Sequence, residues 1–184
     1  MEEEFKEKKS FNWKKYLPFI GIAVAVILVI VLLVALFGGG PKKAVKKFVK
    51  AMDKGNASKL VDCIDFAGSE AWSYKYMDDF DKDDYDDFKE AYKDVDKDDI
   101  KDMKKEAKDE FKDQFEEIKE NYKSYKMKVE KIKDTEKLGK DLYKVKAKIS
   151  ILAKPKDKDD DELDDSSTLT FIVYKGKVIY TSLF

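Results

Sequence analysis

The chain has 184 residues, of which 42% are charged, yet 38 basic and 39 acidic side chains leave a formal net charge of −1. Every basic residue is a lysine and histidine is absent, so the chain lacks the commonest general base and the bidentate guanidinium fork. A balanced charge also argues against nucleic acid as the main partner, because phosphate backbones are bound by net basic surfaces. We therefore expect no enzymatic activity, no cofactor and no nucleic-acid binding.

An uncharged stretch separates Lys15 from Lys42, and its apolar core covers residues 17–37. As a helix rising about 1.5 Å per residue, this core would cross the roughly 30 Å hydrocarbon layer of a bilayer. It is longer than the apolar part of a signal peptide, and no small-residue cleavage site or lipid-attachment cysteine follows it. We predict an uncleaved transmembrane helix over 17–37, preceded by a charged tail (1–16) and followed by a Gly/Pro linker (38–41).

The lysines that flank this segment do not fix its orientation, because the two sides carry equal numbers. We expect a single-pass protein of the cell membrane, with its N-terminus in the cytoplasm and the soluble domain, residues 42–184, outside. The flank that follows the anchor carries Lys42, Lys43, Lys46, Lys47 and Lys50. These lysines either attract anionic lipid headgroups, at about 1 kcal/mol per lysine, or form an ordinary solvated helix face, and both can hold.

The soluble domain opens with helical patterns. Residues 41–55 place apolar side chains on one face and lysines on the other, between a proline suited to a helix start and a glycine suited to its end. Asn56 is expected to cap a second short helix, in which Cys63 is a small buried thiol. Ser69 is expected to cap a third helix that carries aromatic side chains at a spacing of four residues, namely Trp72, Tyr76 and Phe80.

Residues 78–122 are acidic at first and then strongly helical. From 98 to 122, apolar side chains recur every three or four residues, which predicts one long amphipathic helix capped by Asp98. The apolar positions are Ile100, Met103, Ala107, Phe111, Phe115, Ile118 and Tyr122.

Part of the acidic stretch resembles the calcium-binding loop of an EF-hand. Five side chains match loop positions 1, 3, 5, 9 and 12, namely Asp79, Asp81, Asp83, Asp87 and Glu90. However, Asp84 stands where the loop needs glycine, and Asp86 stands where an apolar residue normally lies. We expect weak, diffuse attraction of cations here, and a solvated hairpin loop at the second acidic run, residues 157–165.

The last third of the chain alternates apolar and polar side chains, as strands do. The pattern predicts strands at 125–129 and 141–154, a polar loop at 155–167, and two further strands that meet in a tight turn at Lys175–Gly176. Because helices precede strands, we expect an α+β fold in which helices cover one face of a curled antiparallel sheet of about four strands.

The stretch PKKAVKKFVKAMDKGNASKLVDCID at 41–65, followed by such a sheet, resembles the nuclear-transport-factor-2-like (cystatin-like) superfamily. It is most similar to a bacterial, membrane-anchored branch that forms a domain of unknown function. The resemblance implies a cone-shaped fold with a pocket between sheet and helices, and residues 78–122 would be a helical insertion. It carries over no active site, because the histidine of the superfamily's catalytic pairs is missing.

These observations favour an extracytoplasmic binding or interaction module that is not catalytic. One alternative is an accessory or sensor subunit of a membrane assembly that oligomerises through the helix at 98–122. A second alternative is a weak cation-binding or pocket-enzyme domain. The partner, whether a protein or a small molecule, is not identified by the sequence.

Overall fold

The computed structural model describes residues 40–72, 80–157 and 161–183. The predicted charged tail, the predicted transmembrane helix and the first two residues of the predicted Gly/Pro linker lie outside these residues. Within them, no helix has both the length and the apolar character that a membrane crossing requires.

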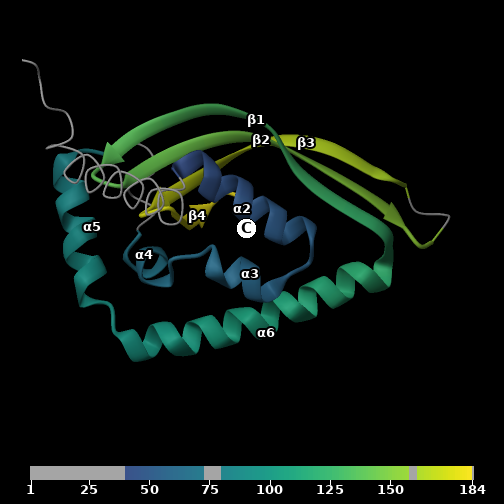
Figure 1. Ribbon diagram of the computed structural model, residues 1–184, viewed down its shortest axis with the longest axis horizontal. Coiled ribbons are helices and arrows are strands. Elements are labelled where there is room, and N and C mark those ends of the chain that lie inside the picture. The colour runs from purple at the N-terminus through teal and green to yellow at the C-terminus, as the bar shows by residue number, and fades with distance from the viewer. Residues whose placement is uncertain (1–39, 73–79, 158–160, 184) are drawn as a thin grey trace, which may run out of the picture. The chain divides into compact units, whose positions relative to one another are not determined.

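The described residues form an α+β fold in which five helices precede one antiparallel sheet (Figure 1). The sheet has four strands in the order β1-β2-β3-β4, so each strand pairs with its neighbour in sequence. The helices are α2 (Pro41–Asp53), α3 (Ala57–Asp62), α4 (Phe66–Ala71), α5 (Lys82–Asp94) and α6 (Lys97–Asn121). The strands are β1 (Tyr122–Gly139), β2 (Leu142–Pro155), β3 (Leu163–Tyr174) and β4 (Lys177–Thr181). The predicted fold class is confirmed at this level.

The first two helices begin and end where the sequence predicts. Pro41 occupies the first turn of α2, and Gly55 follows the helix with a φ of 56°, a left-handed conformation that glycine adopts without steric cost. Asn56 then caps α3, since its side-chain oxygen accepts a hydrogen bond from the Lys59 amide at 2.9 Å.

The predicted third helix is wrong in both cap and length. Asp65, not Ser69, caps α4, and Ser69 lies inside the helix, where its hydroxyl donates to the Asp65 carbonyl. The helix ends before Trp72, whose backbone is extended. The Trp72 ring nevertheless stacks on that of Phe80, with the ring centroids 5.7 Å apart. Tyr76 lies outside the described residues.

Most of the acidic stretch forms a helix of its own, and the long helix has another cap than predicted. Asp81 and Asp84 form a reciprocal capping box at the start of α5, which uses acidic side chains near the positive end of the helix dipole. The cap of α6 is Asp96, which accepts from the Asp98 amide at 2.7 Å, so the predicted cap Asp98 belongs to the first turn.

The hairpin turn of the sheet agrees with the prediction, but β1 and β3 are longer than predicted. The tight turn is confirmed, since Lys175 and Gly176 both have positive φ, at 47° and 78°, as a two-residue hairpin loop requires. However, β1 continues to Gly139 through shifts of register that break the apolar alternation. Likewise β3 begins at Leu163 inside the predicted polar loop, because its first residues pair with β2 while their side chains face solvent.

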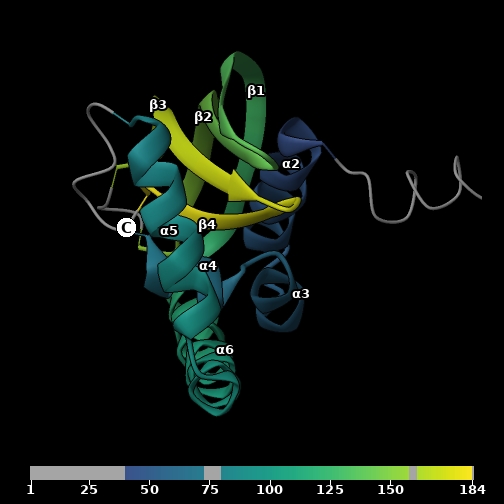
Figure 2. The same cartoon turned by 90° about the vertical axis from the view of Figure 1, so that its left-hand side faces the viewer.

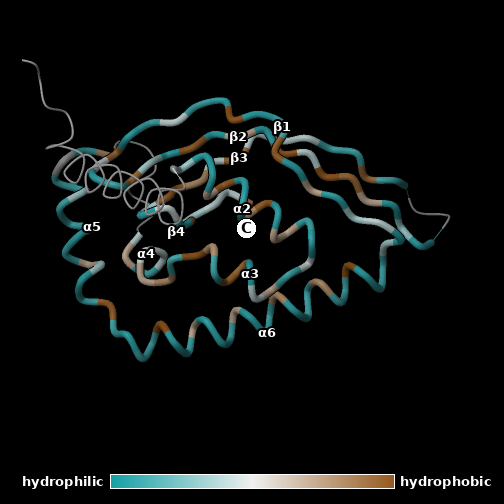
Figure 3. Tube along the Cα trace, in the orientation of Figure 1, coloured by the Kyte–Doolittle hydropathy of each residue, from teal (hydrophilic) through white to brown (hydrophobic). Residues whose placement is uncertain are grey.

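The concave face of the sheet arches over α2 (Figure 1). Side chains that alternate along β2 and β3, such as Val145, Phe171 and Val173, pack against Phe48 of α2, and the Phe48 and Phe171 rings meet edge to face at 6.1 Å. Figure 3 shows that apolar and polar residues alternate along α2 and along much of the strands, consistent with one face of each packing in this core. This contact forms the main core.

Helices cover both faces of the sheet, and not one face as predicted. Ile172 and Tyr174 alternate with Phe171 and Val173 along β3 and therefore point to the opposite face of the sheet. There they pack in a second core with Phe88 of α5 and Trp72. Figure 2 shows α5 and α2 on opposite sides of β3 and β4. The fold is therefore three layers thick at the hairpin end of the sheet.

We expect Phe88→Ala to lower the free energy of unfolding by about 3–5 kcal/mol, because it empties the centre of this second core. The Phe88 side chain has no exposed surface, and its ring lies 5.0 Å from that of Tyr174. Urea denaturation of the full chain measures the effect, with Glu90→Ala on the exposed side of α5 as the control. A loss below about 1 kcal/mol would contradict the assignment of α5 to the second face.

Candidate functional site

The five lysines predicted to lie near the membrane form the exposed face of α2. Lys42, Lys43, Lys46, Lys47 and Lys50 are all exposed, while the other face of the helix is buried in the main core. None of them makes an ion pair with a carboxylate of the described residues. Their charges are therefore available to a partner outside the domain.

The acidic residues that match an EF-hand do not form a loop where the structure describes them. Asp81 caps α5, and Asp83, Asp87 and Glu90 lie within that helix, so most of the loop positions are helical. Asp79 lies outside the described residues. Among residues 40–72, 80–157 and 161–183, no three acidic, cysteine or histidine side chains are grouped as metal ligands would be.

The second acidic run extends the hairpin between β2 and β3. Asp164 and Asp165 belong to β3, and Glu162 pairs with Lys154 of β2 at 2.9 Å, where both side chains are well exposed. An exposed pair of this kind adds little to stability. The run is a solvated strand end in the part that the structure describes.

A large apolar hollow, which we call the apolar groove, lies between α6 on one side and α4 and β4 on the other. Its volume is about 490 Å³, which is within the range of small-molecule sites. Seven of its lining residues are apolar, namely Phe48, Ile64, Phe66, Met103, Phe111, Val178 and Ile179. The polar side chains that line it are Ser69, Glu110, Gln114, Tyr180 and Thr181.

The charge of the apolar groove is unusual for this chain. Although 38 of 184 residues are lysine, no lysine is among the described residues that line the groove, and Glu110 is the one charged residue there. A bound molecule would meet apolar walls, a few hydrogen-bonding groups and a negative charge. The groove thus suits a neutral or cationic apolar molecule and disfavours an anion.

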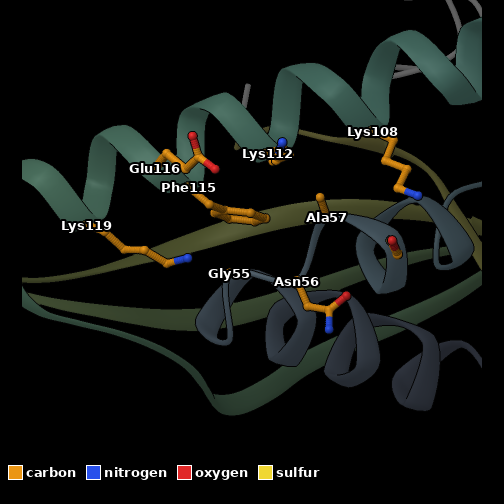
Figure 4. Close-up of a pocket in the computed structure, with 9 residues that line it drawn as sticks. Gly55, Asn56, Ala57, Lys108, Lys112, Phe115, Glu116 and Lys119 are labelled. Atoms are coloured by element: carbon orange, nitrogen blue, oxygen red, sulfur yellow. The ribbon is translucent and has the colours of Figure 1, made fainter.

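A second hollow, which we call the lysine cleft, lies between α6 and the turn that joins α2 to α3 (Figure 4). Its volume is about 240 Å³. On the α6 side it is lined by Lys108, Lys112, Phe115, Glu116 and Lys119. On the other side it is lined by Gly55, Asn56, Ala57 and Ser58.

The walls of the lysine cleft are held together by Phe115. This side chain is 5% exposed, and a Cβ on Gly55 would lie 3.5 Å from its ring, so the turn and the helix are in direct contact. Figure 4 shows Lys108 and Lys119 at opposite ends of this hollow, on either side of the Phe115 ring, while the amine of Lys112 lies beside α6.

A hydrogen bond between Tyr92 and Asp65 lies at the edge of the second core, beside α4. The Tyr92 hydroxyl donates to Oδ2 of Asp65 at 3.2 Å, and Nζ of Lys175 lies 4.8 Å from the ring centres of both Tyr92 and Tyr174. Burial, and after it the negative charge of Asp65, raises the pKa of Tyr92 to about 12. The hydrogen bond joins α5 to the start of α4, and the Lys175 contact joins α5 to the β3–β4 turn.

Cys63 is half-buried at the end of α3. Burial is the main cause that raises the pKa of its thiol, which makes the reactive thiolate scarcer. The side chain packs against the main core but is less buried than predicted.

The two hollows were missed by the sequence reasoning. The groove joins residues from α2 to β4, and no local pattern indicates that they meet. The lysine cleft left a clearer signal, because Lys108, Lys112 and Lys119 follow one another at helical spacings beside the apolar stripe of α6.

Comparison of the chain with protein-family models, with curated proteins and with solved structures finds no match. Its function must therefore be argued from these sites.

We expect the phenol of Tyr92 to titrate near pH 12 in the folded protein and near pH 10 in the unfolded chain. Between these values the folded state keeps a proton that the unfolded state releases. The stability that this proton contributes is present below pH 10 and is lost as pH rises through 12.

Ultraviolet titration of tyrosinate in the wild type and in Tyr92→Phe isolates this group by difference. Asp65→Asn keeps an oxygen to cap α4 but removes the charge, so it should lower the pKa of Tyr92 without restoring the ordinary value, since burial remains. A Tyr92 that titrates near 10 in the folded wild type would show that the pair is not formed.

Proposed function

We propose that the chain is a membrane-anchored, non-catalytic binding protein whose domain takes up a small apolar molecule in the apolar groove. The groove is the observation that carries this proposal. Its size suits a small molecule, and its inner wall consists of side chains that are almost fully buried, such as Phe48, Val178 and Ile179. The ligand class that fits is neutral or cationic, because Glu110 is its charged lining residue.

The absence of a catalytic role is part of the same proposal. The chain contains no histidine, and its groove places a single carboxylate among apolar and hydroxyl or amide groups. A pocket enzyme of the resembled superfamily would need a pair of groups to transfer protons. Binding without reaction is the simpler use of such a site.

An oligomerising subunit is less well supported. That alternative needs the apolar stripe of α6 to face outward, but Phe115 is buried and Phe111 and Ile118 pack against the main core. The apolar face of the long helix thus packs on its own domain or lines the apolar groove. No described residue of the stripe is left as an exposed large apolar side chain.

The membrane anchor at 17–37 and the outward position of the domain remain our proposals for residues outside the described part. They rest on the length of the uncharged run and on the resemblance to the cystatin-like, membrane-anchored branch. The exposed lysines of α2 support them, because Pro41 begins that helix only a few residues after the run ends. Anionic headgroups are the partner that such lysines would meet.

Photolabelling of the full chain in lipid nanodiscs tests the groove. A neutral alkyl diazirine should mark peptides that contain Phe66, Met103 or Phe111, as read by mass spectrometry. Gln114→Trp should reduce labelling of these peptides about tenfold, or about 1.4 kcal/mol of binding free energy, because the exposed Gln114 lines the groove and the larger ring would fill its rim.

Gln114→Ala is the matched control, since it removes the amide and leaves the groove open. Labelling that is absent from these peptides, or that Gln114→Trp does not reduce, would contradict the proposed ligand site.

Protease treatment of intact cells tests the orientation. We expect the domain from residue 42 onward to be digested, because we place it outside, while a cytoplasmic marker protein survives. A domain that is degraded only after the cells are lysed would overturn the outward orientation.

A further inference from the structure

The first half of β3 forms an open edge of the sheet. β4 pairs with β3 only from Phe171 onward. Thr170 bonds to the chain that follows β4, since its carbonyl accepts from the Ser182 amide and its amide donates to the Ser182 hydroxyl, both at 3.0 Å. Beside residues 163–169, no described strand lies on the side away from β2, and Figure 1 shows this part of β3 extending beyond β4.

The backbone groups that face the open edge belong to the even-numbered residues. The Lys175 amide donates to the Asp141 carbonyl, just before β2, whereas Thr170 bonds on the β4 side. Because hydrogen-bonding sides alternate along a strand, odd residues face β2 and even residues face away from it. Three residues thus present an amide and a carbonyl at the open edge, namely Asp164, Ser166 and Thr168. The Ser166 amide is contacted at 2.7 Å by the carboxylate of Asp165, an exposed side chain that a strand partner would displace.

The opposite edge of the sheet, β1, is protected against pairing with a further strand, and the open edge of β3 is not. Register shifts interrupt β1 at four places, and each shift breaks the row of groups that another strand would need. β1 also carries six lysines, namely Lys123, Lys126, Lys128, Lys131, Lys133 and Lys137. Residues 163–169 pair with β2 without any shift and contain neither lysine nor proline. An edge that lacks these devices is a template for another strand.

The segment 163–169, with the sequence LDDSSTL, is complementary to a second copy of itself. When two copies run antiparallel with Ser166 of each at a two-fold axis, residues that face the open edge lie opposite one another, as the hydrogen bonds require. Leucine then meets leucine, and each aspartate meets a hydroxyl side chain, so no like charges lie opposite each other. With the second member in the other copy, the pairs are Leu163 with Leu169, Asp164 with Thr168 and Asp165 with Ser167.

Other registers of this pairing are less favourable. A centre at Asp165 would bring two carboxylates of the same residue together, and like charges directly opposite destabilise a strand pair. A centre at Ser167 would place Asp164 opposite Thr170, whose amide and carbonyl already bond to Ser182. The register centred on Ser166 is therefore the one that uses the whole open edge.

The same register covers an exposed apolar side chain. Leu163 is 46% exposed and is the one large apolar residue that is exposed in the described part of the chain. Its partner in this register, Leu169, already packs against the main core on the concave face of the sheet. Both leucines are odd-numbered residues of one strand, so the pairing extends the apolar surface of that face.

We propose that two copies of the chain associate through the open edges of β3, so that their sheets join into one continuous sheet. Each of the three pairs of outward-facing residues exchanges two backbone hydrogen bonds. The contact uses both open edges and leaves the protected β1 strands outermost, so association stops at a dimer. Because the contact is short, the dimer is weak and separates without unfolding either domain. It involves β3 and not α6, and it does not depend on the apolar groove.

Disulfide cross-linking of the full chain in lipid vesicles tests the dimer and its register. In a Cys63→Ala background, mild oxidation should link two copies of Ser166→Cys. The Cα atoms of a hydrogen-bonded antiparallel pair lie about 5.5 Å apart, which is within the range of disulfides. Asp164→Cys is the matched control, because it is equally exposed but lies four residues, or roughly 13 Å along the strand, from its own copy.

The control variant should cross-link only to a partner at the predicted position. Asp164→Cys alone should give no dimer, and a mixture of Asp164→Cys with Thr168→Cys chains should give one. Failure of Ser166→Cys to cross-link, or equal cross-linking of Ser166→Cys and Asp164→Cys alone, would overturn the proposal.

Two lysine variants separate the register from the net charge. Ser166→Lys places lysine opposite lysine at the two-fold axis and should raise the dissociation constant several-fold. Thr168→Lys adds the same charge but places it opposite Asp164 of the other copy, so it should lower the dissociation constant. Both positions are exposed, so neither variant disturbs a core. Sedimentation equilibrium of the full chain in detergent measures the constants, and equal effects of the two variants would contradict the pairing.

Discussion

The last four residues of β3 are buried on both faces, and the arrangement of the helices follows from this constraint. Phe171 and Val173 point to the concave face, while Ile172 and Tyr174 point to the other, and all four are at most 6% exposed. A strand with consecutive buried residues needs cover on each side. The amphipathic helix α2 covers one face, and α5 with the end of α4 covers the other. The chain must therefore cross from one face to the other before it enters the sheet.

The long helix α6 leads the chain from α5 back to the main core, and both hollows lie along this helix. It begins just after α5 and ends where β1 begins, and its 25 residues span about 37 Å at 1.5 Å per residue. Phe115 fixes it against the α2–α3 turn, and the apolar groove opens where it passes β4 and the short helix α4. The two flanks of the helix differ in charge, because lysines face the turn while Glu110 and Gln114 face the groove. One helix thus lines both hollows.

The sequence was most informative where one local pattern decides the structure. The face of α2, the cap of Asn56 and the turn at Lys175–Gly176 were predicted, since each depends on a few adjacent residues. Asp65 was not predicted as a cap because Ser69 is an equally good capping residue type. The choice between them depends on a tertiary contact, since the residues around Asp65 pair with Val178 of β4. The second layer was not predicted, because the apolar run Phe171–Tyr174 indicates a strand but not which elements cover its two faces. The two hollows form only through tertiary contacts, which the periodicity of the sequence does not indicate.

Native-state hydrogen exchange of the β3 amides measures the two-sided burial most directly. If both faces are covered, the amides of residues 171–174 exchange only through global unfolding and are among the slowest in the domain. The amides of residues 163–167, in the same strand but with exposed side chains, should exchange much faster. Equal exchange rates along the whole of β3 would contradict the account, because the strand would then have no segment held between two layers of helices.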